Sequence, residues 1–223
     1  MKKIFIFTLL LTLSDAEIFK EYFKNNVLKS EIEYVKGTRT DTKEGTKEGE
    51  ERIYYNSGQL AYTVHNTEGK RNGTLIWYDR EQHRLESIDY KMGKRDGQSH
   101  IYYADGTLRA EVSYTDDKKE GKEKEYFSTG KLASSVQYTQ GKKEGLQTDY
   151  YESGQIKNKV TYKNNYKEGF KTSYDKNGTI LQNLEYKMGR PVETMKSIQE
   201  KKPDATIEAF KKMNFNPQHK KLN

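Results

Sequence analysis

The stretch that decides the fold lies at residues 121–145 and reads GKEKEYFSTGKLASSVQYTQGKKEG. A glycine opens it, an aromatic pair follows at Tyr126 and Phe127, and Gly130 marks a turn. The same spacing returns every 24 residues, and the opening glycines are Gly49, Gly73, Gly97, Gly121, Gly145 and Gly169. Six units of equal length therefore fill residues 49–192, which predicts a repeat architecture.

Within a unit the apolar residues recur with a period of two. In the third unit Leu108, Val112 and Tyr114 alternate with polar residues, which is typical of a half-buried strand. Gly106 lies in the turn before that strand, so each unit is predicted to be one β-hairpin. Because a lone hairpin is not stable, the hairpins must stack on one another. The predicted fold is an all-β repeat, an elongated single-layer array of antiparallel hairpins flanked by short helical caps.

A second turn is predicted four residues before each unit boundary. Only glycine, aspartate and asparagine occur there: Gly69, Gly93, Asp117, Gly141, Asn165 and Gly189. These residues tolerate a positive φ, so the position is predicted to be left-handed. The second unit has Gln82 and Arg84 where the others have glycine and a leucine or isoleucine, which predicts a distorted hairpin there.

One candidate binding surface is aromatic. The tyrosine column that includes Tyr54 and Tyr102 is predicted to point inward together with the aliphatic residues. Adjacent strand residues face opposite sides, so the residues that follow are predicted to form an exposed stripe suited to protein or sugar contacts. They are Tyr55, Tyr103, Phe127 and Tyr151. The alternative is that the sheet coils, or that loops cover this face.

A second candidate surface is basic. Cation pairs recur at one turn, and the clearest are Lys94, Arg95, Lys118, Lys119, Lys142 and Lys143. Such an edge would attract anionic headgroups, envelope polysaccharides or acidic proteins. The alternative is structural, because Asp96 and Glu120 lie beside the cations, and because charged edges prevent sheets from aggregating.

The first residues have the layout of a secretory signal peptide. A basic start at Lys2 and Lys3 precedes an apolar run at residues 4–13 and small residues before position 17. The run is too short to span a bilayer as a helix. We therefore predict a signal peptide over residues 1–16, export to the periplasm, cell surface or medium, and no transmembrane segment after cleavage. The alternative is a buried N-terminal strand or helix.

Both ends of the array are predicted to be capped. Residues 17–29 place apolar side chains at spacings of three and four, which favours an amphipathic helix, and residues 30–48 are predicted to hold a degenerate repeat. The segment 193–223 is predicted to be a helical cap or tail with Ile207 and Phe210 on one face. The alternative for this basic segment is a helix on a membrane surface.

The composition excludes several kinds of chemistry. There is no cysteine, and the four histidines are far apart in the sequence, so disulfides and cysteine zinc sites are ruled out and a helical histidine pair is absent. No catalytic motif interrupts the repeat. We predict no enzyme activity, no cofactor and no metal. Nucleic acid is not an expected partner for an exported chain without a nucleic-acid-binding motif.

The repeat resembles the MORN repeat and, more closely, its bacterial MORN-2-type variant, an antitoxin-like family. The unit from Gly121 to Gly145 carries the pattern best, with Tyr126-Phe127, Gly130, Leu132, Tyr138 and Gly141-Lys142. The resemblance implies a scaffold, a membrane-associated module or a partner-binding surface without catalytic residues. The antitoxin likeness implies a cytosolic partner, which the apparent signal peptide opposes.

We therefore expect an exported protein that binds a macromolecular partner, a protein or an anionic envelope surface. The alternatives are a carbohydrate-binding module of the cell envelope, or an antitoxin-like or structural scaffold.

Overall fold

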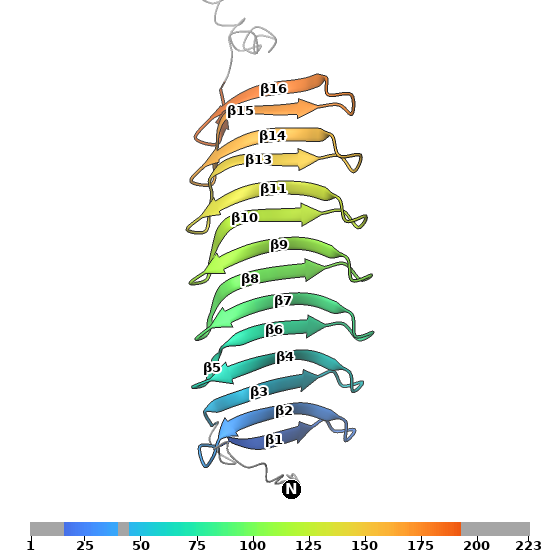
Figure 1. Cartoon of the computed structure of the whole chain (residues 1–223), viewed down its shortest axis with the longest axis vertical. Coiled ribbons are helices and arrows are strands. Elements are labelled where there is room, and N and C mark those ends of the chain that lie inside the picture. The colour runs from blue at the N-terminus through green and yellow to red at the C-terminus, as the bar shows by residue number, and fades with distance from the viewer. Residues whose placement is uncertain (1–15, 40–44, 193–223) are drawn as a thin grey trace, which may run out of the picture.

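The computed structural model describes residues 16–39 and 45–192, which form one antiparallel β-sheet of 17 strands (Figure 1). Within these residues there is no helix. The strands are β1 Ala16–Tyr22, β2 Leu28–Val35, β3 Lys47–Tyr54, β4 Leu60–Thr67, β5 Lys70–Arg71, β6 Gly73–Tyr78, β7 Arg84–Lys91, β8 Lys94–Tyr102, β9 Leu108–Thr115, β10 Lys118–Tyr126, β11 Leu132–Thr139, β12 Lys142–Lys143, β13 Gly145–Tyr150, β14 Ile156–Lys163, β15 Tyr166–Tyr174, β16 Ile180–Lys187 and β17 Arg190–Pro191. The predicted all-β array of antiparallel hairpins is confirmed.

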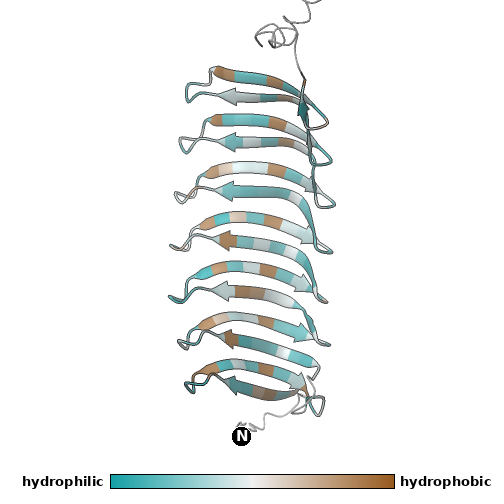
Figure 2. Ribbon diagram, turned by 180° about the vertical axis from the view of Figure 1, so that it is seen from behind, coloured by the Kyte–Doolittle hydropathy of each residue, from teal (hydrophilic) through white to brown (hydrophobic). Residues whose placement is uncertain are grey.

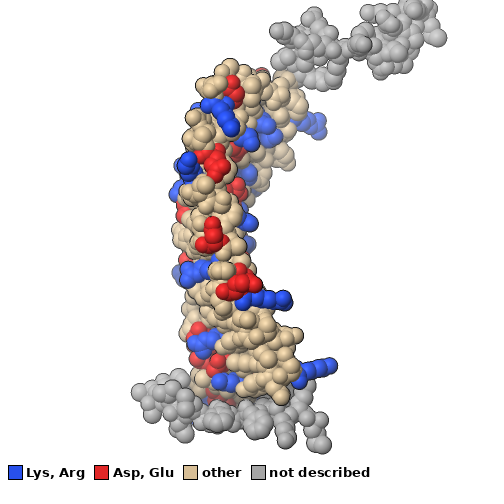
Figure 3. All heavy atoms as spheres, turned by 90° about the vertical axis from the view of Figure 1, so that its right-hand side faces the viewer, with Lys and Arg blue, Asp and Glu red and all other residues tan. Residues whose placement is uncertain are grey.

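The long strands pair in the order of the sequence, so successive hairpins lie side by side along the sheet (Figure 1). The short strands β5 and β12 pair with β4 and β11, as do β6 and β13. The ribbon is bowed along its length (Figure 3). It has two long edges. We call the edge that carries the five-residue hairpin connections, such as 103–107, the loop edge, and the edge that carries the two-residue turns, such as 116–117, the turn edge.

Backbone torsions explain the tight turns at the turn edge. Asp117 and Asn165 have φ angles of 66° and 71°, so the predicted left-handed position is confirmed. The preceding residue is also left-handed, as at Met92 with φ 49° and Met188 with φ 50°. Two successive positive φ angles define the type I′ turn, whose twist matches that of the flanking strands.

The distorted hairpin predicted for the second unit is wrong. Gln82 adopts a φ of 68°, as the glycines do at this position, and its N–H donates to the Asp79 carbonyl at 3.2 Å. The Gln82 amide also donates to the carbonyls of Leu60 at 2.9 Å and Asp79 at 3.1 Å. These side-chain bonds tie the left-handed glutamine to two neighbouring backbone segments, and the turn is retained.

The two faces of the sheet differ from the predicted arrangement. Val64, Ile88, Val112, Val136, Val160 and Leu184 form one column, and we call the side that bears them the valine face. Tyr126 lies on the opposite face, because its hydroxyl donates to Glu111, the strand neighbour of Val112, at 2.8 Å. The prediction that this tyrosine column points inward with the valines is therefore wrong.

A β-bulge in each hairpin accounts for the difference. Ile53 pairs with Tyr62 whereas Tyr54 pairs with Leu60, so Ala61 is an additional residue. A one-residue slip changes which face a side chain occupies. The same shift occurs between Ile101 and Tyr102.

The predicted N-terminal helix is also wrong, because residues 16–35 form the hairpin of β1 and β2. Its loop has Asn26 at φ 63° in the position of the hairpin glycines. The residues whose spacing suggested a helix instead match the repeat pattern. Tyr22-Phe23 is the aromatic pair of this hairpin, and Tyr34 pairs across the strands with Glu17, seventeen positions before it. Seven hairpins are thus present in the described residues, and the degenerate repeat starts earlier than predicted.

The interior of the sheet is a line of side chains rather than a large core. Apolar bands recur on every hairpin (Figure 2). Val64 is 1% exposed and Val160 4%, whereas Leu184 in the last hairpin is 37% exposed. Stacking by both neighbours therefore buries this column. The predicted C-terminal cap, and the signal peptide apart from Ala16, lie outside the described residues.

Candidate binding surfaces

The predicted aromatic and basic residues lie at opposite edges of the sheet. Arg95 is the second residue of β8, at the turn edge, and Tyr103 follows the last residue of β8 at the loop edge. Eight residues of extended strand at ~3.3 Å each separate them by roughly 26 Å. The two sets therefore do not form one continuous site.

The aromatic residues do not form a fully exposed stripe. Tyr55, Tyr103, Phe127 and Tyr151 are all half-buried. The hydroxyl of Tyr103 donates to the carbonyl of Tyr126 in the next hairpin at 2.7 Å, and the Tyr55 and Tyr151 hydroxyls make the same bond to Tyr78 and Tyr174. These tyrosines join consecutive hairpins, so the predicted exposure is wrong, and their role in binding stays a prediction.

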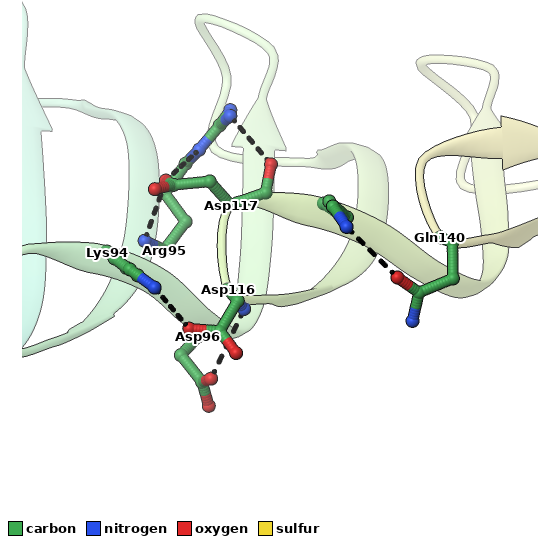
Figure 4. A network of polar contacts seen from close by, with 7 residues as sticks. Lys94, Arg95, Asp96, Asp116, Asp117 and Gln140 are labelled. Carbon is green, nitrogen blue, oxygen red and sulfur yellow. Dashed lines mark hydrogen bonds and ion pairs between the residues drawn. The ribbon is translucent and has the colours of Figure 1, made fainter.

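The six basic residues separate into two columns. Lys94, Lys118 and Lys142 are exposed, and each reaches the turn of the next hairpin, as Figure 4 shows for Lys94. Lys94 pairs with Asp116 at 2.8 Å, whereas Lys118 donates to the neutral side chain of Gln140 at 3.2 Å. Lys142 likewise donates to Asn164, at 3.4 Å.

The second column lies on the valine face and is half-buried among tyrosines. The guanidinium of Arg95 lies 4.3 Å from the ring centre of Tyr114, and Lys119 lies 5.0 Å from that of Tyr138. Tyr114 in turn pairs across the strands with Lys119. Cations and tyrosines thus alternate along the turn edge as a cation–tyrosine ladder, composed of Arg71, Tyr90, Arg95, Tyr114, Lys119, Tyr138, Lys143, Tyr162, Lys167 and Tyr186.

The acidic residues beside the cations have a structural role. Glu120 accepts a hydrogen bond from the backbone N–H of Gln140 at 2.8 Å, and Glu144 accepts one from Asn164 at 2.9 Å. Asp96 makes the corresponding contact with the N–H of Asp116, at 3.4 Å (Figure 4). These carboxylates therefore bind the first left-handed residue of each turn. At the opposite edge, the loop edge, which faces the viewer in Figure 3, positive and negative side chains are mixed as well.

The sequence analysis missed an apolar stripe on the valine face. Cross-strand pairs place Ile53 beside Tyr62, Tyr62 beside Trp77, and Ile101 beside Ala110. The stripe is interrupted by Glu86, which pairs with both Trp77 and Ile101. The Tyr62 and Trp77 ring centres are 4.6 Å apart. Ile53, Trp77 and Ile101 are half-buried. The signal was the column one residue before the first tyrosine of each unit.

The same column is polar in the later hairpins. Glu125, Asp149 and Ser173 stand where Ile53, Trp77 and Ile101 stand earlier. Asp149 accepts hydrogen bonds from neighbouring polar side chains, which are Ser134 at 3.1 Å, Gln147 at 2.9 Å and Asn158 at 3.2 Å. The valine face therefore has an apolar half and a polar half.

A depression of about 500 Å³ lies on this face near β3 and β4. Its lining residues are Gly45, Lys47, Glu51, Tyr62, Asn66, Gly69 and Arg71. Glu51 is 4% exposed and accepts hydrogen bonds from Lys47 at 3.1 Å, Tyr62 at 2.9 Å and Asn66 at 3.0 Å.

Electrostatics in the depression follow from these contacts. Burial alone raises the pKa of Glu51, but the hydrogen bond and charge of Lys47, with the bonds from Tyr62 and Asn66, hold it below its ordinary value. Burial, as the larger cause, and the charge of Glu51, as the second, raise the pKa of Tyr62 to about 12. Glu51 is thus an ionised acceptor at neutral pH and Tyr62 a neutral donor.

Among the described residues no group of three or more acidic or histidine side chains is placed to hold a metal ion. The same residues contain no helix with the length and apolar character needed to cross a bilayer.

Comparison with protein families gives one match. A family model described as MORN repeat variant matches residues 18–36, 47–65, 95–116, 119–140 and 143–164. The first of these segments includes most of the β1–β2 hairpin, whose residues 17–29 the sequence analysis had interpreted as a helix. No curated protein matches the chain.

Proposed function

The chain belongs to the MORN repeat variant family, and from that premise we propose that it is a non-enzymatic protein that binds a protein partner through the apolar stripe of its valine face. Repeats of this family often bind proteins or membranes and are generally not enzymatic. The observation that carries the proposal is Trp77, half-buried on a one-layer sheet and flanked by Tyr62.

The composition of the stripe favours a protein partner. Aromatic residues such as Trp and Tyr dominate the binding energy of protein interfaces, and a rim of neighbouring contacts excludes water from them. Ile53 lies beside Tyr62, and Glu86 separates Trp77 from Ile101 on the same face. The side chains of Ile53 and Ile101 offer no hydrogen-bonding group. A sugar would leave its hydroxyls unpaired against these aliphatic side chains, which costs binding free energy.

The test is an exchange within one column of the sheet. We expect the double variant Trp77→Asp/Ile101→Glu to fold, because the same column already holds Asp149 and Glu125. A photoreactive residue at position 53 in intact cells should crosslink one defined protein, and the double variant should weaken the affinity of that purified protein at least 100-fold. Glu125→Gln is the matched control on the same face and should leave the affinity unchanged.

Three results would contradict this proposal. They are equal crosslinking from position 149, capture of lipid or polysaccharide in place of a protein, and unchanged affinity of the double variant. Retention on purified envelope polysaccharide would instead support the carbohydrate-binding alternative.

A second candidate is contact with an anionic envelope surface through the later part of the turn edge. Lys118 and Lys142 contact neutral amides, whereas Lys94 is neutralised by Asp116. We expect Lys118→Gln/Lys142→Gln to weaken binding to vesicles that contain anionic lipid, with a steep loss between 50 and 200 mM salt. Lys94→Gln should change binding less. Binding that is independent of salt would argue against this surface.

We also propose that the protein is exported. The basic start and the apolar run at residues 4–13 support this. Mass spectrometry of the protein from fractionated cells should find an N-terminus near residue 17, and Leu10→Arg should leave an uncut precursor inside the cell. An uncut, cytosolic wild-type protein would favour the antitoxin-like alternative.

A further inference from the structure

The cation–tyrosine ladder is interrupted at one position. Tyr90, Tyr114, Tyr138 and Tyr162 each have a cation on both sides, as Tyr138 has Lys119 at 5.0 Å and pairs across the strands with Lys143. Asn66 occupies the corresponding position in the β3–β4 hairpin and pairs with Arg71. The cation on its other side is Lys47, 24 residues before Arg71.

The depression described above lies at this interruption. Lys47, Asn66 and Arg71 all line it, together with Tyr62. We call it the ladder slot. Arg71 still lies over the ring of the next ladder member, Tyr90, at 5.4 Å, so the ladder resumes on one side of the slot. On the other side Lys47 pairs with Glu51.

The fourth repeat shows how the same position is filled by a ring. There Glu123 corresponds to Glu51, Lys119 to Lys47, and Tyr138 to Asn66. Lys119 pairs with Glu123, and the Tyr138 hydroxyl also bonds to Glu123. The acid and the cation four residues before it are therefore the same in both hairpins. The phenol that bonds to the acid differs, because Tyr138 bonds to Glu123, whereas Glu51 accepts from Tyr62, which stands where the fourth repeat has Ser134.

We propose that the ladder slot binds a phenol ring, placed between Lys47 and Arg71 with its hydroxyl donating to Glu51. Two cations favour the electron-rich faces of such a ring. Glu51 is buried and accepts one hydrogen bond, from Asn66, on its Oε2 atom, so that atom has capacity for the hydroxyl. The ring belongs either to a small phenol or to a tyrosine side chain of a peptide.

The inference does not depend on the proposed function, because the cations of the ladder define the slot, although Tyr62 lies in both the slot and the apolar stripe. Trp77 provides a convenient signal: it is the single tryptophan of the chain, and its ring contacts Tyr62, which lines the slot. Titration of the full chain with p-cresol should change the Trp77 fluorescence saturably, with NMR shifts at the backbone amides of Asn66 and Arg71. Toluene, which lacks the hydroxyl, should bind at least fivefold more weakly.

The decisive variant is Asn66→Tyr, which places the ladder's own ring in the slot. It should fold, bind p-cresol at least tenfold more weakly and unfold at a higher urea concentration. Ile101→Glu, which alters the stripe but not the slot, should leave p-cresol binding unchanged. Failure of partner binding with p-cresol binding intact would therefore reject the proposed function and not this inference.

A second probe distinguishes the source of the ring. Binding of N-acetyltyrosinamide as tight as that of p-cresol supports a peptide side chain, and binding of p-cresol alone supports a free phenol. Absence of a saturable signal with both probes, or equal affinity in wild type and Asn66→Tyr, would overturn the proposal.

Discussion

The two halves of the valine face have the same backbone pairing and different chemistry. In the first half, Ile101 pairs with Ala110; in the second, Glu125 pairs with Ser134 at the equivalent place. The valine column does not change in this way, because Val112 and Val136 are buried in both halves. The fold therefore requires the valine column and tolerates either chemistry in the neighbouring column. An apolar side chain that the fold does not need is a candidate for binding.

The largest expected effect tests this contrast between columns. Val136→Asp should lower the free energy of unfolding by at least ~3 kcal/mol, because it buries an unpaired charge in the line of packed side chains. Ile101→Glu should change it by less than ~1 kcal/mol, since Glu125 holds the same place in the next hairpin. Urea denaturation followed by circular dichroism measures both. Similar losses in the free energy of unfolding for the two variants would contradict the contrast between the valine column and its neighbouring column.

A smaller effect is expected between the middle and the end of the valine column. Val64→Ala should cost about 2 kcal/mol, because Val64 is 1% exposed and stacked on both sides. Leu184→Ala should cost less than ~1 kcal/mol, although it removes more atoms, because Leu184 is 37% exposed. Urea midpoints would show the difference. A larger loss at Leu184 would mean that this end is covered in solution.

The tyrosines of the loop edge allow a sharper comparison. Tyr103→Phe should cost about 1 kcal/mol, because it removes the hydroxyl bond to the Tyr126 carbonyl and retains the ring. Phe127 occupies the same position one hairpin later without a hydroxyl. Phe127→Tyr should therefore stabilise the protein by a similar or smaller amount. Thermal unfolding of both variants measures the pair, and no change in either would show that the hydroxyl does not join hairpins.

The smallest expected effect concerns pH. The pKa of Glu51 in the folded protein lies below its ordinary value of 4.5, so its ionised form stabilises the fold above that pH. This contribution should be lost as pH falls below 4.5 through the folded-state pKa. Glu51→Gln should show a shallower decline of urea midpoint with acid than wild type. An identical decline would indicate that the contacts of Glu51 do not favour its charge.

The turns of the turn edge could be predicted from the sequence because they depend on the torsion angles that single residues tolerate. The left-handed turn was predicted correctly at Asp117 and Asn165, since few residues tolerate a positive φ. The β1–β2 hairpin was missed because Phe19, Phe23 and Val27 have spacings of four, which also fit a helical face. The asparagine in the glycine position, Asn26, was the available signal.

The sequence by itself determined that the chain is a β-hairpin repeat and where most of its turns lie, because these depend on glycine torsions and on the alternation of side chains along one strand. The tertiary structure alone decided which columns share a face, since a bulge at Tyr54 shifts the register by one residue. It also decided that the Tyr103 hydroxyl reaches the next hairpin, and that Asn66 leaves a slot between Lys47 and Arg71. Those contacts join residues of neighbouring hairpins, and no rule within one strand specifies them.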